Sequence, residues 1–150
     1  MKETIEQLDI KSNGKYIDAT AGEGGHLSEI LKLGGEVLGI DIDQNQVRKL
    51  KEKMSGQDRL QLTQGSYANI AEIAAKCGFN EVDGVIFDLG LSMEQLARSG
   101  RGFSYRGLEE PLDMRLDCTV QTTTASDIVS TFTEEELYEI FASYAEELHS

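Results

Sequence analysis

The chain of 150 residues has little of what several classes of protein depend on. Its two cysteines, Cys77 and Cys118, lie far apart and match no metal-binding pattern, so we expect reduced thiols and no metal site. No apolar stretch approaches the roughly 20 residues of a membrane helix, and no signal peptide is visible. These absences predict a cytoplasmic protein that does not act at a membrane.

Positive charge is scarce as well. There are 14 Lys and Arg against 27 Asp and Glu, and the resulting net charge of −13 argues against a surface that binds nucleic acid everywhere. One loop-like region nevertheless gathers four arginines, although acidic residues there balance them: Arg98, Arg101, Arg106 and Arg115. Contact with RNA must therefore be local, or lie on a part of the protein outside this chain.

Strands and helices alternate along the first part of the chain. Apolar patterns predict strands at residues 15–18, 36–40, 60–63 and 82–88, with helices after the first three of them, the last two at 44–54 and 68–76. This alternation predicts an α/β fold with a parallel sheet, preceded by a short helix near residues 2–8. The run from Val82 to Asp88 is almost continuously apolar, which predicts a strand covered on both faces.

The pattern changes after the fourth strand. Residues 91–117 have few periodic apolar positions and many Gly, Ser and Arg, and helices resume near 124–130 and 134–147. Thr133 followed by three glutamates predicts the start of the last helix, which we expect to be still running at Ser150. The chain is therefore expected to divide into a cofactor domain, residues 1–92, and the incomplete start of a helical domain, residues 93–150.

A glycine-rich turn, Gly22-Glu23-Gly24-Gly25, lies between the first strand and its helix. Glycines there let the backbone approach a nucleotide-type cofactor, and Asp41, after the second strand, can accept hydrogen bonds from ribose hydroxyls. The dinucleotide pattern needs a third small residue where this chain has Leu27. We therefore expect S-adenosylmethionine, and keep an NAD-dependent oxidoreductase as the alternative.

Other candidate site residues have both a functional and a structural interpretation. His26 either contacts the cofactor or caps and packs its helix. Asp43 is expected to be a solvated acid that starts a helix, whereas Asp88, at the carboxyl edge of the sheet, either serves the site or caps the next segment. Tyr67 either stacks on an adenine or packs. The segment 101–106 mixes arginine with aromatic residues, which suits RNA bases and phosphates but also an ordinary loop.

Several segments occur in the order and spacing of one family: Ile17–His26, Gly39–Asp43, Val82–Ser92, Arg101–Ser104, Pro111–Asp117 and Tyr144–Glu147. Together they resemble the ribosomal RNA small-subunit methyltransferase H family, also called the MraW family, over essentially the whole chain. The glycine turn is common to methyltransferases in general, whereas the Arg-Gly-Phe-Ser and Pro-Leu-Asp-Met-Arg pair is specific to this family. The resemblance implies a Rossmann-like class I methyltransferase core followed by the start of an inserted helical domain.

The resemblance also implies a function in ribosome biogenesis. Members transfer a methyl group from S-adenosylmethionine to the exocyclic N4 of a cytidine in the decoding region of 16S rRNA, in the small ribosomal subunit. By matching positions, the resemblance implies these cofactor-binding residues: Gly24, Gly25 and His26 at the methionine end, Asp41 at the ribose, Tyr67 at the adenine, and Asp88 and Gln95 completing the pocket.

Some positions depart from the family pattern. Met93-Glu94 stands where members have Ser-Pro, which leaves Gln95 aligned in a loop of altered geometry. The family's opening motif and the last strands of its sheet are absent, so we interpret the chain as truncated at both ends. A cofactor-binding remnant without activity is therefore a further alternative.

The scarcity of proline bears on the chemistry. Other amino-methyltransferases use an Asp/Asn-Pro-Pro-aromatic motif after the fourth strand, and a chain whose single proline is Pro111 cannot have it. Our hypothesis is that Asp88, with the Leu89-Gly90 turn, takes the equivalent place. Asp113 and Arg115 are expected to help shape a pocket for a cytidine that has left its stack.

Overall fold

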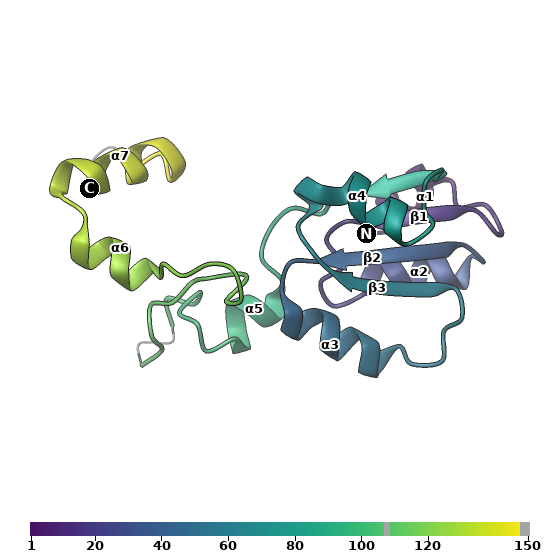
Figure 1. The fold of residues 1–150 in the computed structure, drawn as a ribbon, viewed down its shortest axis with the longest axis horizontal. Coiled ribbons are helices and arrows are strands. Elements are labelled where there is room, and N and C mark those ends of the chain that lie inside the picture. The colour runs from purple at the N-terminus through teal and green to yellow at the C-terminus, as the bar shows by residue number, and fades with distance from the viewer. Residues whose placement is uncertain (107–108, 148–150) are drawn as a thin grey trace. The chain divides into compact units, whose positions relative to one another are not determined.

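The computed structural model describes residues 1–106 and 109–147. The chain splits into two compact units, Met1–Ser92 and Met93–Ser150, and each is described by itself. The first unit consists, in chain order, of α1 (Lys2–Leu8), β1 (Lys15–Asp18), α2 (Gly25–Lys32), β2 (Glu36–Asp41), α3 (Gln44–Lys53), β3 (Leu60–Gln64), the 3-10 helix η1 (Tyr67–Asn69), α4 (Ile70–Lys76) and β4 (Gly84–Ile86) (Figure 1).

The four strands form one parallel sheet in the order β3-β2-β1-β4. Ile17 of β1 lies in register with Leu38 of β2 on one side and with Val85 of β4 on the other. Because all strands run the same way, their carboxyl ends meet at one edge of the sheet, which is where doubly wound folds bind ligands. The predicted α/β fold with a parallel sheet is confirmed.

Helices cover both faces of the sheet. Side chains of β1 point alternately to the two faces, so Tyr16 belongs to one buried cluster with residues of α2 and α3, while Ile17 belongs to a second with Ala74 of α4. Tyr16 is fully buried and Ile17 is nearly so. The most buried part of the first unit is therefore the sandwiched centre of the sheet, β1 and β2, and predicted cofactor residues lie at or just after the carboxyl ends of these strands.

The fourth strand differs from its prediction. β4 comprises only Gly84–Ile86, and although Ile86 is buried, Val85 is 38% exposed and Phe87 is 50% exposed. A strand covered on both faces was therefore the wrong interpretation of this apolar run. The physical reason is position, because β4 is at the edge of the sheet and pairs only with β1 among the described residues.

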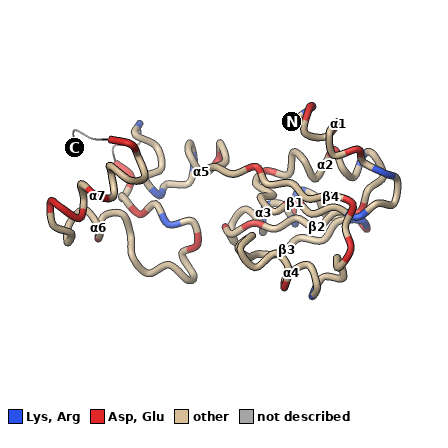
Figure 2. Tube along the Cα trace, turned by 90° about the horizontal axis from the view of Figure 1, so that it is seen from above, with Lys and Arg blue, Asp and Glu red and all other residues tan. Residues whose placement is uncertain are grey.

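The second unit has three helices in its described part, α5 (Met93–Arg98), α6 (Ala125–Thr131) and α7 (Glu134–Tyr144). Thr133 caps α7 as predicted, in a reciprocal pair with Glu136, and acidic residues fill the first turn of that helix (Figure 2). The prediction that this helix continues to 147 is wrong, since it ends at Tyr144 and Glu146 has a left-handed backbone. Ser150 itself lies outside the described residues.

Polar contacts dominate the second unit. Among residues 93–106 and 109–147, no hydrophobic side chain is fully buried, in contrast to the first unit.

In the described ranges of the whole chain, no helix is long and apolar enough to cross a membrane.

Candidate cofactor site

The glycine turn joins β1 to α2 in a backbone conformation that suits glycine. Gly22 and Gly24 have left-handed φ angles of 49° and 81°, which side-chain-bearing residues rarely adopt. A Cβ atom on Gly24 would also lie 2.7 Å from Cδ2 of Leu50. The turn is therefore tightly packed against α3.

Asp41 connects the second strand to this turn. One of its carboxylate oxygens accepts a hydrogen bond from the Gly22 amide at 2.8 Å, and the other accepts from the Asp43 amide at 2.9 Å. Burial raises the pKa of Asp41, and these two hydrogen bonds oppose the rise. Since each carboxylate oxygen can accept more than one hydrogen bond, the geometry is compatible with the predicted contact to a ribose.

Asp43 starts α3, as one of the two acids was expected to do. Its side chain accepts a hydrogen bond from the Asn45 amide at 2.9 Å, which makes it the N-cap of the helix. The expectation that this acid is solvated is wrong, because Asp43 is only 3% exposed.

Asp18 is a candidate site residue that the sequence reasoning missed. It is the last residue of β1 and has no exposed surface. One carboxylate oxygen accepts from the Thr20 amide at 3.2 Å, whereas the other, Oδ2, is buried without a hydrogen-bond partner. The signal that could have found it is that Asp18, like Asp41 and Asp88, is an acid at or just beyond the end of a strand.

The environment of Asp18 is electrostatically unfavourable for a carboxylate. Burial raises the pKa of Asp18 to about 6, with further increases from the negative charges of Asp41 and Asp88. The Thr20 amide and the nearby His26 act in the opposite direction. His26, in the first turn of α2, is itself buried and its Nε2 has no partner in the described structure. Two buried polar atoms thus lie unsatisfied beside the glycine turn.

Asp88 follows β4 at the same edge. Its backbone amide donates to Oγ1 of Thr20 at 2.8 Å, and the residue is exposed. Asp88 does not cap the next helix, because α5 begins only at Met93. The structural alternative for this residue is therefore wrong, and its predicted functional role stays a prediction.

Tyr67 meets an aromatic partner that the sequence reasoning did not identify. Its ring lies edge-on to Phe87, with 6.0 Å between ring centroids and an interplanar angle of 87°. Both side chains are about half exposed, at 48% and 50%. Tyr67 begins η1 just after Gly65, whose amide donates to the Asp41 carbonyl at 2.9 Å, so the aromatic pair belongs to the carboxyl edge.

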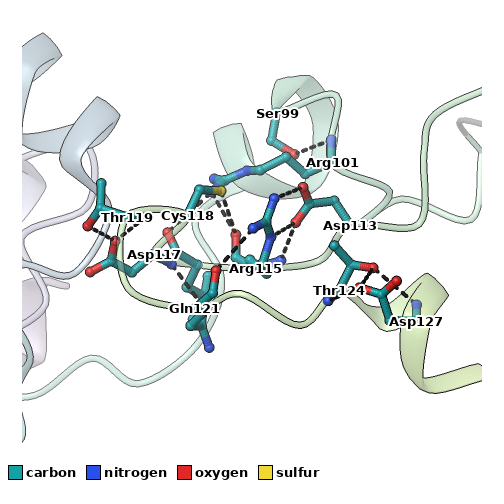
Figure 3. Close-up of polar contacts among 11 residues, drawn as sticks. Ser99, Arg101, Asp113, Arg115, Asp117, Cys118, Thr119, Gln121, Thr124 and Asp127 are labelled. Carbon is teal, nitrogen blue, oxygen red and sulfur yellow. Dashed lines mark hydrogen bonds and ion pairs between the residues drawn. The ribbon is translucent and has the colours of Figure 1, made fainter. Parts of the chain in front are cut away.

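Asp113 and Arg115 form a two-pronged ion pair within the second unit (Figure 3). Arg115 Nε and Nη2 each donate at 2.7 Å to a different oxygen of Asp113, which lowers the pKa of that carboxyl to about 2. Arg101 donates to the carbonyls of Arg115 and Leu116 at 2.8 and 3.2 Å. These guanidinium groups hold the loop together, while the expected roles of Asp113 and Arg115 at the target, and of Gln95 in α5 at the cofactor, remain predictions.

A glycine turn at the carboxyl edge of a parallel sheet, with buried acids at the ends of β1 and β2, defines a domain of the nucleotide-cofactor-binding α/β class. The family model of the MraW methylase family matches residues 1–150. The chain belongs to the MraW methylase family, which confirms the resemblance drawn from its motifs.

Curated relatives agree with this assignment. The chain is 42% identical, over 98% of its length, to ribosomal RNA small subunit methyltransferase H of Mesoplasma florum, and it covers 48% of that protein. Proteins of the same name from Halothermothrix orenii and Clostridium botulinum are 43% and 39% identical over 98% and 100% of the chain. The chain spans about half the length of the curated relatives it matches, with 48% and 49% of the latter two covered.

Proposed function

We propose that this chain carries the S-adenosylmethionine site of a methyltransferase that modifies small-subunit ribosomal RNA. The target proposed for the whole protein is the exocyclic N4 of a cytidine in the decoding region. Support for the RNA comes from the names of the relatives, which are ribosomal RNA small subunit methyltransferases. Support for the cofactor comes from one observation, the set of acids Asp18, Asp41 and Asp88 around the glycine turn.

The charge of this edge favours a cationic ligand. The negative charges of Asp41 and Asp88 raise the pKa of Asp18. Neighbouring like charges disfavour the ionised carboxylate, and a positively charged group bound near them offsets this repulsion. S-adenosylmethionine has a sulfonium and an α-ammonium group, whereas a dinucleotide would add the two negative charges of a pyrophosphate. The same edge therefore disfavours the alternative of an NAD-dependent oxidoreductase.

The unsatisfied buried atoms fit the methionine end of such a cofactor. The Asp18 Oδ2 atom can accept a hydrogen bond from an ammonium group, and His26 Nε2 can donate to a carboxylate when it carries the proton. We assign the ribose hydroxyls to Asp41 and the adenine to Tyr67 and Phe87. This set keeps His26, Asp41 and Tyr67 from the predicted cofactor residues and adds Asp18 and Phe87.

S-adenosylmethionine supplies an electrophilic methyl group when it is bound. The amine of cytosine is a poor nucleophile because its lone pair is delocalised into the ring, so alignment must account for much of the rate. The amine would gain the methyl carbon and release one proton to solvent, while the electron pair of the broken C–S bond would stay on sulfur. Asp88, exposed at this edge, is assigned to accept a hydrogen bond from that amine and so to orient it.

Calorimetric titration with S-adenosylmethionine and with NAD tests the cofactor assignment. We expect the protein to bind S-adenosylmethionine and to give no heat with NAD. The titration is carried out on this chain and on a full-length family member that contains it. Binding by the full-length protein alone would show that truncation prevents cofactor binding by the isolated chain, and binding of NAD in preference would overturn the proposal.

The Asp88→Ala substitution is expected to lower the rate of methyl transfer by about tenfold, the effect of one lost hydrogen bond of about 1.4 kcal/mol. Cofactor affinity should change much less, because the Asp88 amide still bonds Thr20. Transfer of a radiolabelled methyl group to small-subunit RNA measures the rate. Asp58→Ala removes an exposed acid in the α3–β3 loop and serves as the matched control. Undiminished methylation by Asp88→Ala would remove this residue from the mechanism.

The Tyr67→Ala substitution is expected to weaken cofactor binding by about fivefold, because an aromatic contact contributes about 1 kcal/mol beyond its buried area. Tyr67→Phe keeps the ring that faces Phe87 and should bind almost as well as the natural protein. Dissociation constants from calorimetry give the comparison. Equal affinities for all three proteins would show that the adenine lies elsewhere.

A further inference from the structure

Residues 87–92, here called the strap, connect β4 to the end of the first unit and are held by hydrogen bonds at two points. Near its start, the Asp88 amide donates to Oγ1 of Thr20 at 2.8 Å. At its end, Nε2 of Gln46 donates to Oγ of Ser92, also at 2.8 Å. Thr20 already bonds Asp18 and Asp88 in the site, whereas Gln46 has no role in it so far.

The two anchors place the strap across the cofactor edge. Thr20 follows β1, and Gln46 lies in the first turn of α3, which follows β2. Since the sheet order is β2-β1-β4, a segment that leaves β4, meets Thr20 and ends at Gln46 must cross the carboxyl ends of β1 and β2. Asp18 and Asp41 are located at those two ends.

The middle of the strap has little packing to hold it. Leu89 is 65% exposed, and a Cβ atom placed on Gly90 would find no other atom within 4 Å. With so few contacts in between, the position of the strap depends on its anchors. A change at either anchor should therefore be transmitted to Asp88 and the Leu89-Gly90 turn.

Gln46 is a buried amide in a short run of polar residues. It is 4% exposed, whereas the neighbouring Gln44 and Asn45 are exposed. Burying an amide is costly unless it is hydrogen-bonded, and Ser92 supplies the acceptor for Gln46 Nε2. The N-cap at Asp43 fixes the turn of α3 on which Gln46 lies, so the anchor is built on a rigid element.

We propose that Gln46 is a positioning residue for methyl transfer, because its hydrogen bond to Ser92 fixes the strap above the cofactor edge. This inference rests on the proposed function. Through the strap, Gln46 sets where Asp88 presents its carboxylate to the amine. Neither Gln46 nor Ser92 needs to touch the cofactor, so their removal should affect turnover more than cofactor binding.

Methylation kinetics of the whole protein with Gln46→Ala, Ser92→Ala and the double substitution test this. We expect kcat to fall about fivefold in each single variant, and no further in the double variant, since all three remove the shared Gln46–Ser92 hydrogen bond of about 1 kcal/mol. Cofactor affinity from calorimetry should change less than about twofold, in keeping with loss of positioning alone. Gln44→Ala, on the exposed side of the same helix turn, is the matched control and should match the natural protein. Ser92→Thr keeps the hydroxyl and should restore kcat.

Hydrogen exchange provides a second readout that does not depend on activity. The Asp88 amide is bonded to Thr20, and its exchange should become faster in Gln46→Ala but not in Gln44→Ala. An unchanged kcat and unchanged exchange in Gln46→Ala, with cofactor binding and methylation intact in the natural protein, would overturn the positioning role alone. A natural protein that neither binds S-adenosylmethionine nor methylates RNA would overturn the proposed function, and the role of Gln46 with it.

Discussion

The Asp18→Asn substitution is expected to stabilise the protein at neutral pH and to weaken cofactor binding at the same time. The natural carboxyl has a pKa raised from 3.8 to about 6 by burial, so keeping it ionised costs about 3 kcal/mol of folding free energy. Asparagine has nearly the same shape, can still accept from the Thr20 amide, and has no charge to bury. A buried acid that opposes folding is expected at a functional site.

The sign of the pH dependence follows from the direction of the shift. An acid with a raised folded pKa contributes stability below its unfolded pKa, and this contribution is lost as the pH rises through the folded pKa. Between pH 4.5 and 7.5 the natural protein should therefore lose about 2 kcal/mol that the Asp18→Asn variant keeps. Over the same pH range the natural protein should bind the cofactor more tightly as the pH rises, because only the ionised Asp18 carboxylate attracts the ammonium group.

Urea unfolding at the two pH values measures the stability difference, and calorimetry at pH 7.5 measures the affinity. We expect Asp18→Asn to bind S-adenosylmethionine at least about tenfold more weakly, since a charge-assisted hydrogen bond contributes about 1.5–3 kcal/mol. The exposed Asp58→Asn is the control for loss of one negative charge. A difference in unfolding free energy that does not depend on pH would contradict the raised pKa. Unchanged affinity would remove Asp18 from the cofactor site.

Gly102→Ala is expected to disrupt the loop of the second unit that carries the two family-specific segments. Gly102 has a left-handed φ of 78°, which costs an alanine about 1–2 kcal/mol. Its Cβ atom would also collide with the Pro111 carbonyl oxygen and lie 3.1 Å from the Leu112 Cα, and these backbone atoms cannot move aside easily. The substitution should therefore separate the Arg-Gly-Phe-Ser segment from the Pro-Leu-Asp-Met-Arg segment.

Gly100 offers a control for the backbone cost by itself. Its φ is also left-handed, at 67°, but a Cβ atom there has no other atom within 4 Å. Hydrogen exchange of the Met114 amide, which donates to the Arg101 carbonyl at 2.8 Å, reports whether the two segments remain joined. We expect fast exchange in Gly102→Ala and nearly natural exchange in Gly100→Ala. Equal exchange in the two variants would show that close packing at Gly102 is not what joins the segments.

Local features of both units could be predicted from the sequence because they depend on neighbouring residues. Apolar periodicity located β1, β2 and the helices α2 and α3 that follow them, and Thr133 identified the start of α7 through its own hydroxyl and Glu136. The apolar run around Val85 was misinterpreted because its exposure depends on residues that are distant in the sequence. Whether a strand is covered depends on the helices that pack on its faces, and Val85, in register with Ile17, is not part of the buried cluster around Ala74 on that face.

The sequence by itself determined the α/β order of elements, the glycine turn and membership of the MraW methylase family, since each is written in residues close together or in a fixed order. Only the tertiary structure decided that Asp18 is buried and destabilised, that Phe87 faces Tyr67, and that Gln46 holds Ser92. These relations join residues from different strands and helices. Burial, charge and hydrogen bonding at the site depend on distances that exist only once the strands are paired.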